Sequence, residues 1–178
     1  MRRYVRLAVV LAAQLAILVA IPLPQVLARY RGTPVTLRTA PVDPFDVLAG
    51  HYVTLSYEVE RESMLRADRS RTSSEPGLSN GERVWLTVAR GEPAWTLVGV
   101  TRERPAPAPG HVAIRARWTR SRGAQLEDAS RFYVTEERGK AIDARRRTGA
   151  DLVDLRVDED GTPAVVRLRG PGIDLRAQ

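Results

Sequence analysis

The sequence predicts a mainly β protein: an N-terminal transmembrane helix followed by a small antiparallel β sandwich or barrel-like domain with one short helix. Two patterns lead to this fold. Residues 7–28 are almost continuously apolar and uncharged, whereas after residue 31 apolar and polar residues alternate in short runs separated by Pro, Gly and Asp. The 178 residues suit one such domain, so we assign residues 1–31 to the membrane segment and residues 32–178 to the domain.

The apolar stretch at residues 7–28 is close to the roughly 20 residues that a helix needs to cross a bilayer core. Arginines at positions 2, 3 and 6 precede it, and Arg29 and Arg31 follow it. Tyr4 and Tyr30 lie at its two edges, as interfacial aromatic residues do. Because basic residues favour the cytoplasmic side, we expect a single-pass protein of the inner or plasma membrane with a cytoplasmic N-terminus and the domain outside the cytoplasm.

A cleaved secretory signal is the alternative for this segment. The basic start, the apolar core, the helix-breaking Pro22 and the small residues at Val26 and Ala28 suit cleavage near Ala28. The domain would then be a secreted or periplasmic protein. We favour the uncleaved anchor because the apolar stretch is long and is followed by arginines.

Charge and composition argue against several classes of function. The formal net charge is +7, but residues 1–31 hold five arginines and no acid, so the rest carries 23 basic against 21 acidic groups. A domain this close to neutral lacks the strong positive electrostatic potential that attracts a polyanion, so we expect no nucleic-acid partner. The chain has no cysteine and only two histidines, His51 and His111. Disulfides, thiolate chemistry and a three-histidine metal site are therefore excluded, and we expect no metal and no cofactor.

Within the domain, the spacing of apolar residues predicts the elements in order. We expect strands at residues 33–39, 52–60, 84–89, 95–102, 111–119, 131–135, 151–157 and 164–168. Two pairs of these form hairpins, residues 84–102 and residues 151–168, the second around Asp160 and Gly161. Residues 61–81 are polar and predict a mainly mobile connection that begins with a helical turn. One short helix is expected from Glu136 to Gly149, capped by Thr135.

Residues 50–57 read GHYVTLSY. They closely resemble the GDYXXLXY signature of a family of bacterial membrane-anchored proteins that has no established activity and often occurs alongside multi-pass membrane proteins. Residues 35–46 are similar to the family's strand and DPxD turn, and residues 131–140 to its aromatic strand and Gly-Lys helix start. The chain departs from the signature at His51, which replaces the Asp.

Two interpretations of this motif stay open. Gly50 permits a tight bend from the Pro/Asp loop into the strand, and Leu55 and Tyr57 share one face of that strand, so the motif suits a structural role. Alternatively, Tyr52 and its neighbours form one rim of a binding surface. The motif and possible binding surface comprise Asp43, Pro44, Asp46, Gly50, His51, Tyr52, Leu55, Tyr57, Phe132, Tyr133, Glu136, Gly139 and Lys140.

The sequence offers little support for catalysis. Lys140, the only lysine, is the one candidate base for a Ser–Lys hydrolase, and no serine has a recognisable nucleophile context. We therefore assign no catalytic residue and predict a non-enzymatic accessory or partner-binding protein of the bacterial envelope. Its expected partners are the lipid bilayer, through residues 7–28, and a multi-pass membrane protein that Gln14 contacts. The alternative is an exported hydrolase or ligand-binding domain.

Overall fold

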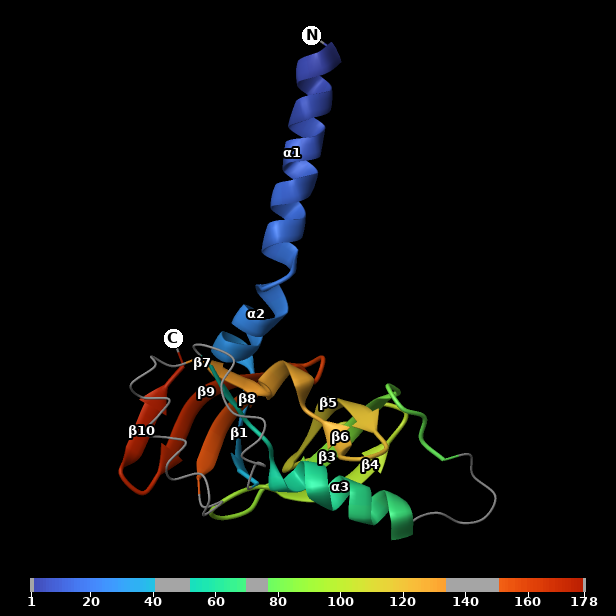
Figure 1. Cartoon of the computed structure of the whole chain (residues 1–178), viewed down its shortest axis with the longest axis vertical. Helices are drawn as coiled ribbons and strands as arrows, with labels where there is room; N and C mark the ends of the chain where they lie inside the picture. The colour runs from blue at the N-terminus through green and yellow to red at the C-terminus, as the bar shows by residue number, and fades with distance from the viewer. Residues whose placement is uncertain (1, 41–51, 70–76, 134–150, 178) are drawn as a thin grey trace.

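The computed structural model describes residues 2–40, 52–69, 77–133 and 151–177. A long apolar helix projects from a domain made mostly of strands, which form two antiparallel four-stranded sheets and a further pair of short strands (Figure 1). The mainly β fold with an N-terminal apolar helix and one short helix is therefore confirmed.

The predicted transmembrane stretch consists of two helices rather than one. α1 spans Arg2–Ala20 and α2 spans Leu23–Arg31, with Pro22 at the break. Proline has no N–H to continue the helical hydrogen bonds, and its ring disturbs the preceding turn. α1 stands clear of the domain (Figure 1), and none of its apolar stretch is buried.

α2, in contrast, is built into the domain. It packs on β8 (Leu152–Val157) and β9 (Pro163–Gly170), and its Ala28 side chain is fully buried. The backbone N–H of Gly32 donates to the carbonyl of Ala28 at 2.9 Å and ends the helix. β1 (Thr33–Arg38) begins at the next residue, so no linker separates the apolar helices from the first strand.

The first sheet has the order β1-β8-β9-β10, and all its neighbours are antiparallel. The predicted hairpin of residues 151–168 is confirmed as β8 and β9, which turn at Gly161 with φ of +77°. β10 (Ile173–Arg176) extends this sheet beyond the predicted strands. The face toward the core is aliphatic and includes Val35, Leu37, Val153, Leu155, Val157 and Leu168.

The second sheet has the order β4-β3-β5-β6 and is a half-barrel. β3 (Arg83–Ala89) and β4 (Thr96–Thr101) form the other predicted hairpin, and β5 (His111–Thr119) has the predicted bounds. β6 (Gly123–Gln125) was not predicted. Helix α3 (Glu58–Arg69) packs against both edge strands, β4 and β6, and so closes the open side of the half-barrel (Figure 1).

The prediction for residues 52–81 is wrong in part. The expected strand ends after three residues, because β2 spans only Tyr52–Thr54. Helix α3 begins at Glu58 and covers the last residues of the expected strand and the start of the expected connection. Residues 58–69 are rich in good helix formers, and Glu58 and Glu60 lie in the first turn, where acids stabilise the positive end of a helix. Leu55, Tyr57 and Val59 are all buried, but on a strand end and a helix start.

We expect Gly32→Ala to destabilise the domain and to loosen α2 from it. A Cβ at this position would lie 2.6 Å from the carbonyl oxygen of Ala28 and 2.8 Å from the backbone nitrogen of Val157. Since both are backbone atoms, the substitution should lower the free energy of unfolding by about 1–3 kcal/mol, measured by denaturation in detergent. Gly99→Ala is the matched control because its new Cβ has no atom within 4 Å. Equal stability of the two variants would contradict the tight joint.

Candidate functional site

The two aromatic segments singled out in the sequence pair with one another. β2 and β7 (Arg131–Tyr133) are antiparallel, with Tyr52 opposite Tyr133 and Thr54 opposite Arg131. The backbone N–H of Leu55 extends this pairing by donating to the carbonyl of Ser130 at 2.7 Å. Segments far apart in the chain thus form one small strand pair.

Tyr57 is the residue at which this pair passes into helix α3. Its side chain is fully buried, and its hydroxyl donates a hydrogen bond to the carbonyl of Ala129 at 2.8 Å, as a buried tyrosine requires. Its backbone also forms an isolated antiparallel bridge with Thr39, directly after β1. Leu55 and Phe132 are buried in the same core. These three motif side chains therefore pack the domain rather than face solvent.

A buried carboxylate, Glu60, follows in the first turn of α3. Its Oε2 accepts a hydrogen bond from the backbone N–H of Tyr57 at 3.1 Å, which satisfies one of the unpaired donors at the start of a helix. Its Oε1 accepts a hydrogen bond from the backbone N–H of Leu126 at 2.8 Å. Glu60 therefore joins the start of α3 to the segment that follows β6.

Ser63 repeats this link one turn along α3. Its hydroxyl donates to the carbonyl of Glu60 at 2.5 Å and accepts the backbone N–H of Ala124 at 2.8 Å. Gly123 has a φ of +78°, and a Cβ there would lie 2.5 Å from the Ser63 hydroxyl oxygen. We call Glu60 and Ser63, with the backbone groups they bond, the Glu60–Ser63 cluster. It holds α3 against the edge of the half-barrel.

Burial dominates the electrostatics of this cluster. It raises the pKa of Glu60 from 4.5 to about 7, because a charged carboxylate loses its hydration in the protein interior. The N–H groups of Leu126 and Tyr57, and the positive charge of Arg122, lower the pKa but do not offset the burial. Glu60 can therefore hold a proton near neutral pH, although its oxygens are bonded to backbone within the fold.

The model of the GDYXXLXY protein family matches residues 14–168 of this chain. The chain belongs to this family. The matched range begins within α1, ends within β9, and includes α2, the other strands of both four-stranded sheets apart from β10, and the β2–β7 pair. No curated protein and no solved structure matches the chain.

The structure describes part of the GDYXXLXY motif and its surroundings. Leu55, Tyr57 and Phe132 lie in the core, and Tyr52 and Tyr133 are placed by their backbone in β2 and β7. The other predicted site residues lie outside the described residues: Asp43, Pro44, Asp46, Gly50, His51, Glu136, Gly139 and Lys140. The helix expected at residues 136–149 lies outside them as well, so a binding surface built on these residues stays a prediction.

Sequence reasoning did not find the Glu60–Ser63 cluster. The alternation at residues 52–60 put Glu60 on the polar face of a strand, away from the core. A signal for the cluster was present: a Glu three residues after the residue that begins a helix is the acidic half of a capping box. The signal was missed because Tyr57, rather than Ser or Thr, stands at the capping position.

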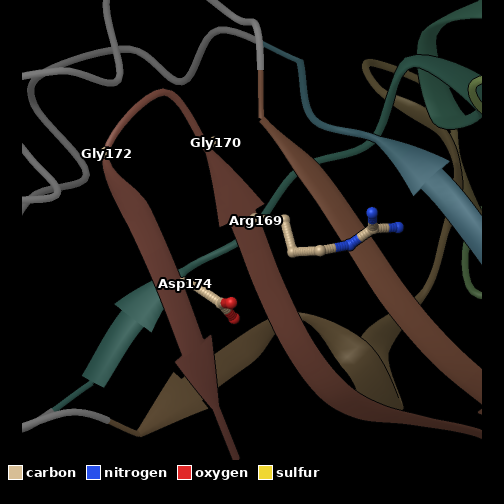
Figure 2. Close-up of a pocket in the computed structure, with 4 residues that line it drawn as sticks. All are labelled: Arg169, Gly170, Gly172 and Asp174. Carbon is tan, nitrogen blue, oxygen red and sulfur yellow. The ribbon is translucent and has the colours of Figure 1, made fainter.

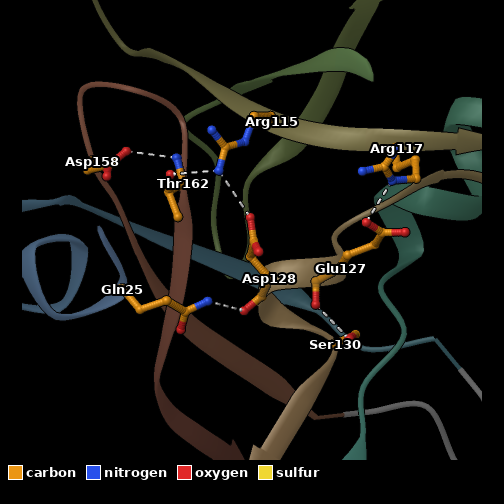
Figure 3. Close-up of polar contacts among 8 residues, drawn as sticks. All are labelled: Gln25, Arg115, Arg117, Glu127, Asp128, Ser130, Asp158 and Thr162. Atoms are coloured by element: carbon orange, nitrogen blue, oxygen red, sulfur yellow. Dashed lines mark hydrogen bonds and ion pairs between the residues drawn. The ribbon is translucent and has the colours of Figure 1, made fainter. Parts of the chain in front are cut away.

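The 3₁₀ turn η2 (Glu127–Ala129) connects α2 with both large sheets (Figure 3). The side-chain amide of Gln25, from α2, donates to the carbonyl of Asp128 at 3.0 Å. One guanidinium nitrogen of Arg115, from β5, lies 3.3 Å from the Asp128 carboxylate and 3.1 Å from the Thr162 hydroxyl, which precedes β9. A single arginine thus connects the half-barrel to the first sheet at the point that α2 contacts.

The hairpin of β9 and β10 carries a shallow depression of about 430 Å³. Its lining residues are Arg169, Gly170, Gly172 and Asp174 (Figure 2). Arg169 points away from Asp174 and donates two hydrogen bonds to Asp154, at 2.8 and 2.6 Å, whereas Asp174 pairs with Arg167. Both charged lining residues are therefore engaged with neighbours on the sheet.

Among the residues that the structure describes, no three His, Asp or Glu side chains come together to hold a metal ion. His111 is exposed, and its Nδ1 lies 3.0 Å from the carbonyl oxygen of Pro109. The acidic residues after β8 form a turn, in which the carboxylate of Asp158 accepts the backbone N–H of Thr162 at 2.7 Å.

Tyr57→Phe tests the structural role of the last residue of the motif. The substitution removes the hydroxyl that donates to Ala129 and keeps the ring in place, so we expect a loss of about 1 kcal/mol in the free energy of unfolding. Tyr30→Phe, at a side chain that is 80% exposed, is the matched control and should leave stability unchanged. Chemical denaturation measures both, and a Tyr57→Phe variant as stable as the parent would contradict this role.

Glu60 should make the domain less stable as the pH rises from about 4.5 to about 7. In this window the folded protein retains the proton and the unfolded chain releases it, so raising the pH favours unfolding. Below the window both states hold the proton, and above it neither does. The part of this pH dependence that Glu60 contributes should be lost in Glu60→Gln, which cannot ionise. It should remain in Glu62→Gln, which alters an exposed carboxylate of the same helix.

The measurement is denaturant unfolding at several pH values across this window. Only the difference in slope between the parent and each variant matters, because other carboxylates contribute equally to both. Asp174 and Glu82 have a lowered pKa, through hydrogen bonds from Arg167 and from the Ser79 backbone, and act at more acidic pH. An unchanged slope in Glu60→Gln would show that Glu60 does not hold the proton.

Proposed function

We propose that this protein is anchored in the bacterial inner or plasma membrane by α1, exposes its β domain outside the cytoplasm, and serves another envelope component as a non-enzymatic accessory. The observation that carries the proposal is the joint between α2 and the domain. Ala28 is fully buried, and Gln25 is hydrogen-bonded to η2. The end of the apolar segment thus packs as part of the fold, which supports an anchor over a detachable leader.

This joint favours an anchor over a cleaved signal. The candidate cleavage site near Ala28 is helical, and the carbonyl of Ala28 accepts the bond that ends the helix. Cutting there would separate the Gln25 contact from the domain and break up α2.

The outer surface of α1 supports a lipid environment. Its apolar side chains have no protein cover, and an exposed apolar surface of this extent in water is a hazard for aggregation. The three arginines at the start of the chain favour the cytoplasmic side, which leaves the domain on the other side of the membrane.

Two observations support an accessory role rather than catalysis. The described motif side chains Leu55, Tyr57 and Phe132 are buried packing residues, and the polar groups of Glu60 and Ser63 bind backbone. Gln14 is the one polar side chain in the apolar part of α1, and lipid offers its amide no hydrogen bond. A second transmembrane helix can satisfy it, which favours an integral membrane protein as the partner.

The experiment is purification of the full-length protein from native membranes after mild cross-linking, followed by intact mass measurement. We expect the uncleaved chain, with an integral membrane protein in a fixed ratio. A chain that begins at Arg29 and is recovered alone from the soluble fraction would overturn the anchor. The alternatives would then be an exported hydrolase or a secreted ligand-binding domain.

Gln14→Leu should weaken the association with the partner. The loss of one interhelical hydrogen bond is worth about 1 kcal/mol, or roughly five-fold in affinity. Quantitative mass spectrometry of the cross-linked partner measures this change. Ala13→Leu adds similar apolar bulk at the neighbouring position and is the control. If both variants retain all of the partner, Gln14 does not contribute to recognition.

A further inference from the structure

We infer that α2 lies half-submerged in the bilayer, so that the β domain is seated directly on the lipid headgroup layer. This inference rests on the proposed membrane anchor and deepens it, because it names the lipid surface itself as a partner of the domain. The lipid-contacting side of α2, here called the outer face, consists of Leu23, Val26, Leu27 and Tyr30.

The polarity of α2 is inverted relative to that of a helix docked on a domain in water. In water, a helix docked on a domain buries its apolar side and shows its polar side to solvent. In α2, the polar Gln25 and the small Ala28 face the domain, whereas the outer face is 39% to 80% exposed. At 100° per residue, the four residues of the outer face fall on one side of the helix, opposite Gln25 and Ala28. A helix with its apolar side turned away from the domain is suited to contact with the lipid acyl chains.

The length of α1 also indicates that part of α2 lies in the membrane. From Leu7 to its end at Ala20, α1 rises about 21 Å, at about 1.5 Å per residue. The hydrocarbon core of a bilayer is about 30 Å thick. The missing 9 Å or so corresponds to about six more residues, which reaches Val26 in α2. With the arginines before Leu7 outside the core, the apolar helices reach this thickness when the first half of α2 lies inside it.

A first half of α2 inside the bilayer places the domain at the membrane surface, because α2 packs directly on the domain. Gln25, one residue before Val26, is bonded to the carbonyl of Asp128 in η2. Shortly after Val26, the last turn of α2 carries Arg29, Tyr30 and Arg31, and the Tyr30 side chain is 80% exposed. Aromatic rings and guanidinium groups are the side chains that prefer the headgroup layer. η2 and the adjacent part of the domain must then lie at the level of the headgroups.

The absence of cysteine from the chain makes this position measurable with single labels. We would prepare Leu15→Cys, Val26→Cys and Val98→Cys, attach a fluorophore to each, and reconstitute the full-length protein in vesicles of phosphatidylethanolamine and phosphatidylglycerol. Val26 and Val98 are matched: both are valines, 44% and 45% exposed, but Val98 lies on β4, away from α2 (Figure 1). Quenching by brominated lipid and by aqueous iodide then reports the surroundings of each label.

We expect brominated lipid to quench the labels at Leu15 and Val26 several-fold more than the label at Val98, and iodide to show the reverse order. If the Val26 label behaves like the Val98 label while the Leu15 label stays in lipid, the anchor holds but the seating of the domain is overturned. A Val26 label protected from both quenchers would mean that protein covers the outer face, which also overturns the inference. A Leu15 label open to iodide would overturn the anchor itself.

Discussion

The close approach of Gly32 to β8 is the constraint on which the arrangement of this chain depends. At this point the end of α2, the start of β1 and the end of β8 share a space that has no room for a side chain. The guanidinium of Arg156 also donates to the carbonyl of Gly32 at 3.1 Å. The apolar helices and the first sheet therefore meet through backbone contacts, which fix direction more strictly than side-chain packing does. The position of the domain relative to α2 follows from this joint.

The elements that the sequence predicted well are those with local, complete patterns. The two hairpins have alternating apolar residues on both strands and turn residues between them, so both halves of each pattern are visible in a short window. β6 has only Gly, Ala and Gln, and owes its place to α3 and β5 rather than to its own residues. The helix α3 was missed because Leu55, Tyr57 and Val59 alternate like a strand, and only the tertiary structure shows that the strand stops at Thr54.

The candidate site, like the fold, could be predicted from the sequence only in part. The motif and its likeness to a family could be seen in the sequence, but the pairing of β2 with β7 is a long-range contact that no local pattern specifies. The alternation at residues 52–60 put Glu60 on the polar face of a strand, and an acidic residue is rarely buried. It is buried here because two backbone N–H groups, one of them supplied by the distant Leu126, replace much of its hydration. Such a partner becomes visible only after folding.

The break at Pro22 has a consequence for how the two ends of the molecule can vary. α1 and α2 are separate helices, so the direction of α1 is not determined by the joint that holds α2 to the domain. Residues that adapt α1 to a neighbouring helix can therefore change without altering the joint at Gly32, and the domain can change without re-aiming α1. For the membrane anchor and the helical partner proposed above, one architecture can in this way be matched to different neighbours by exchanging only its first twenty or so residues.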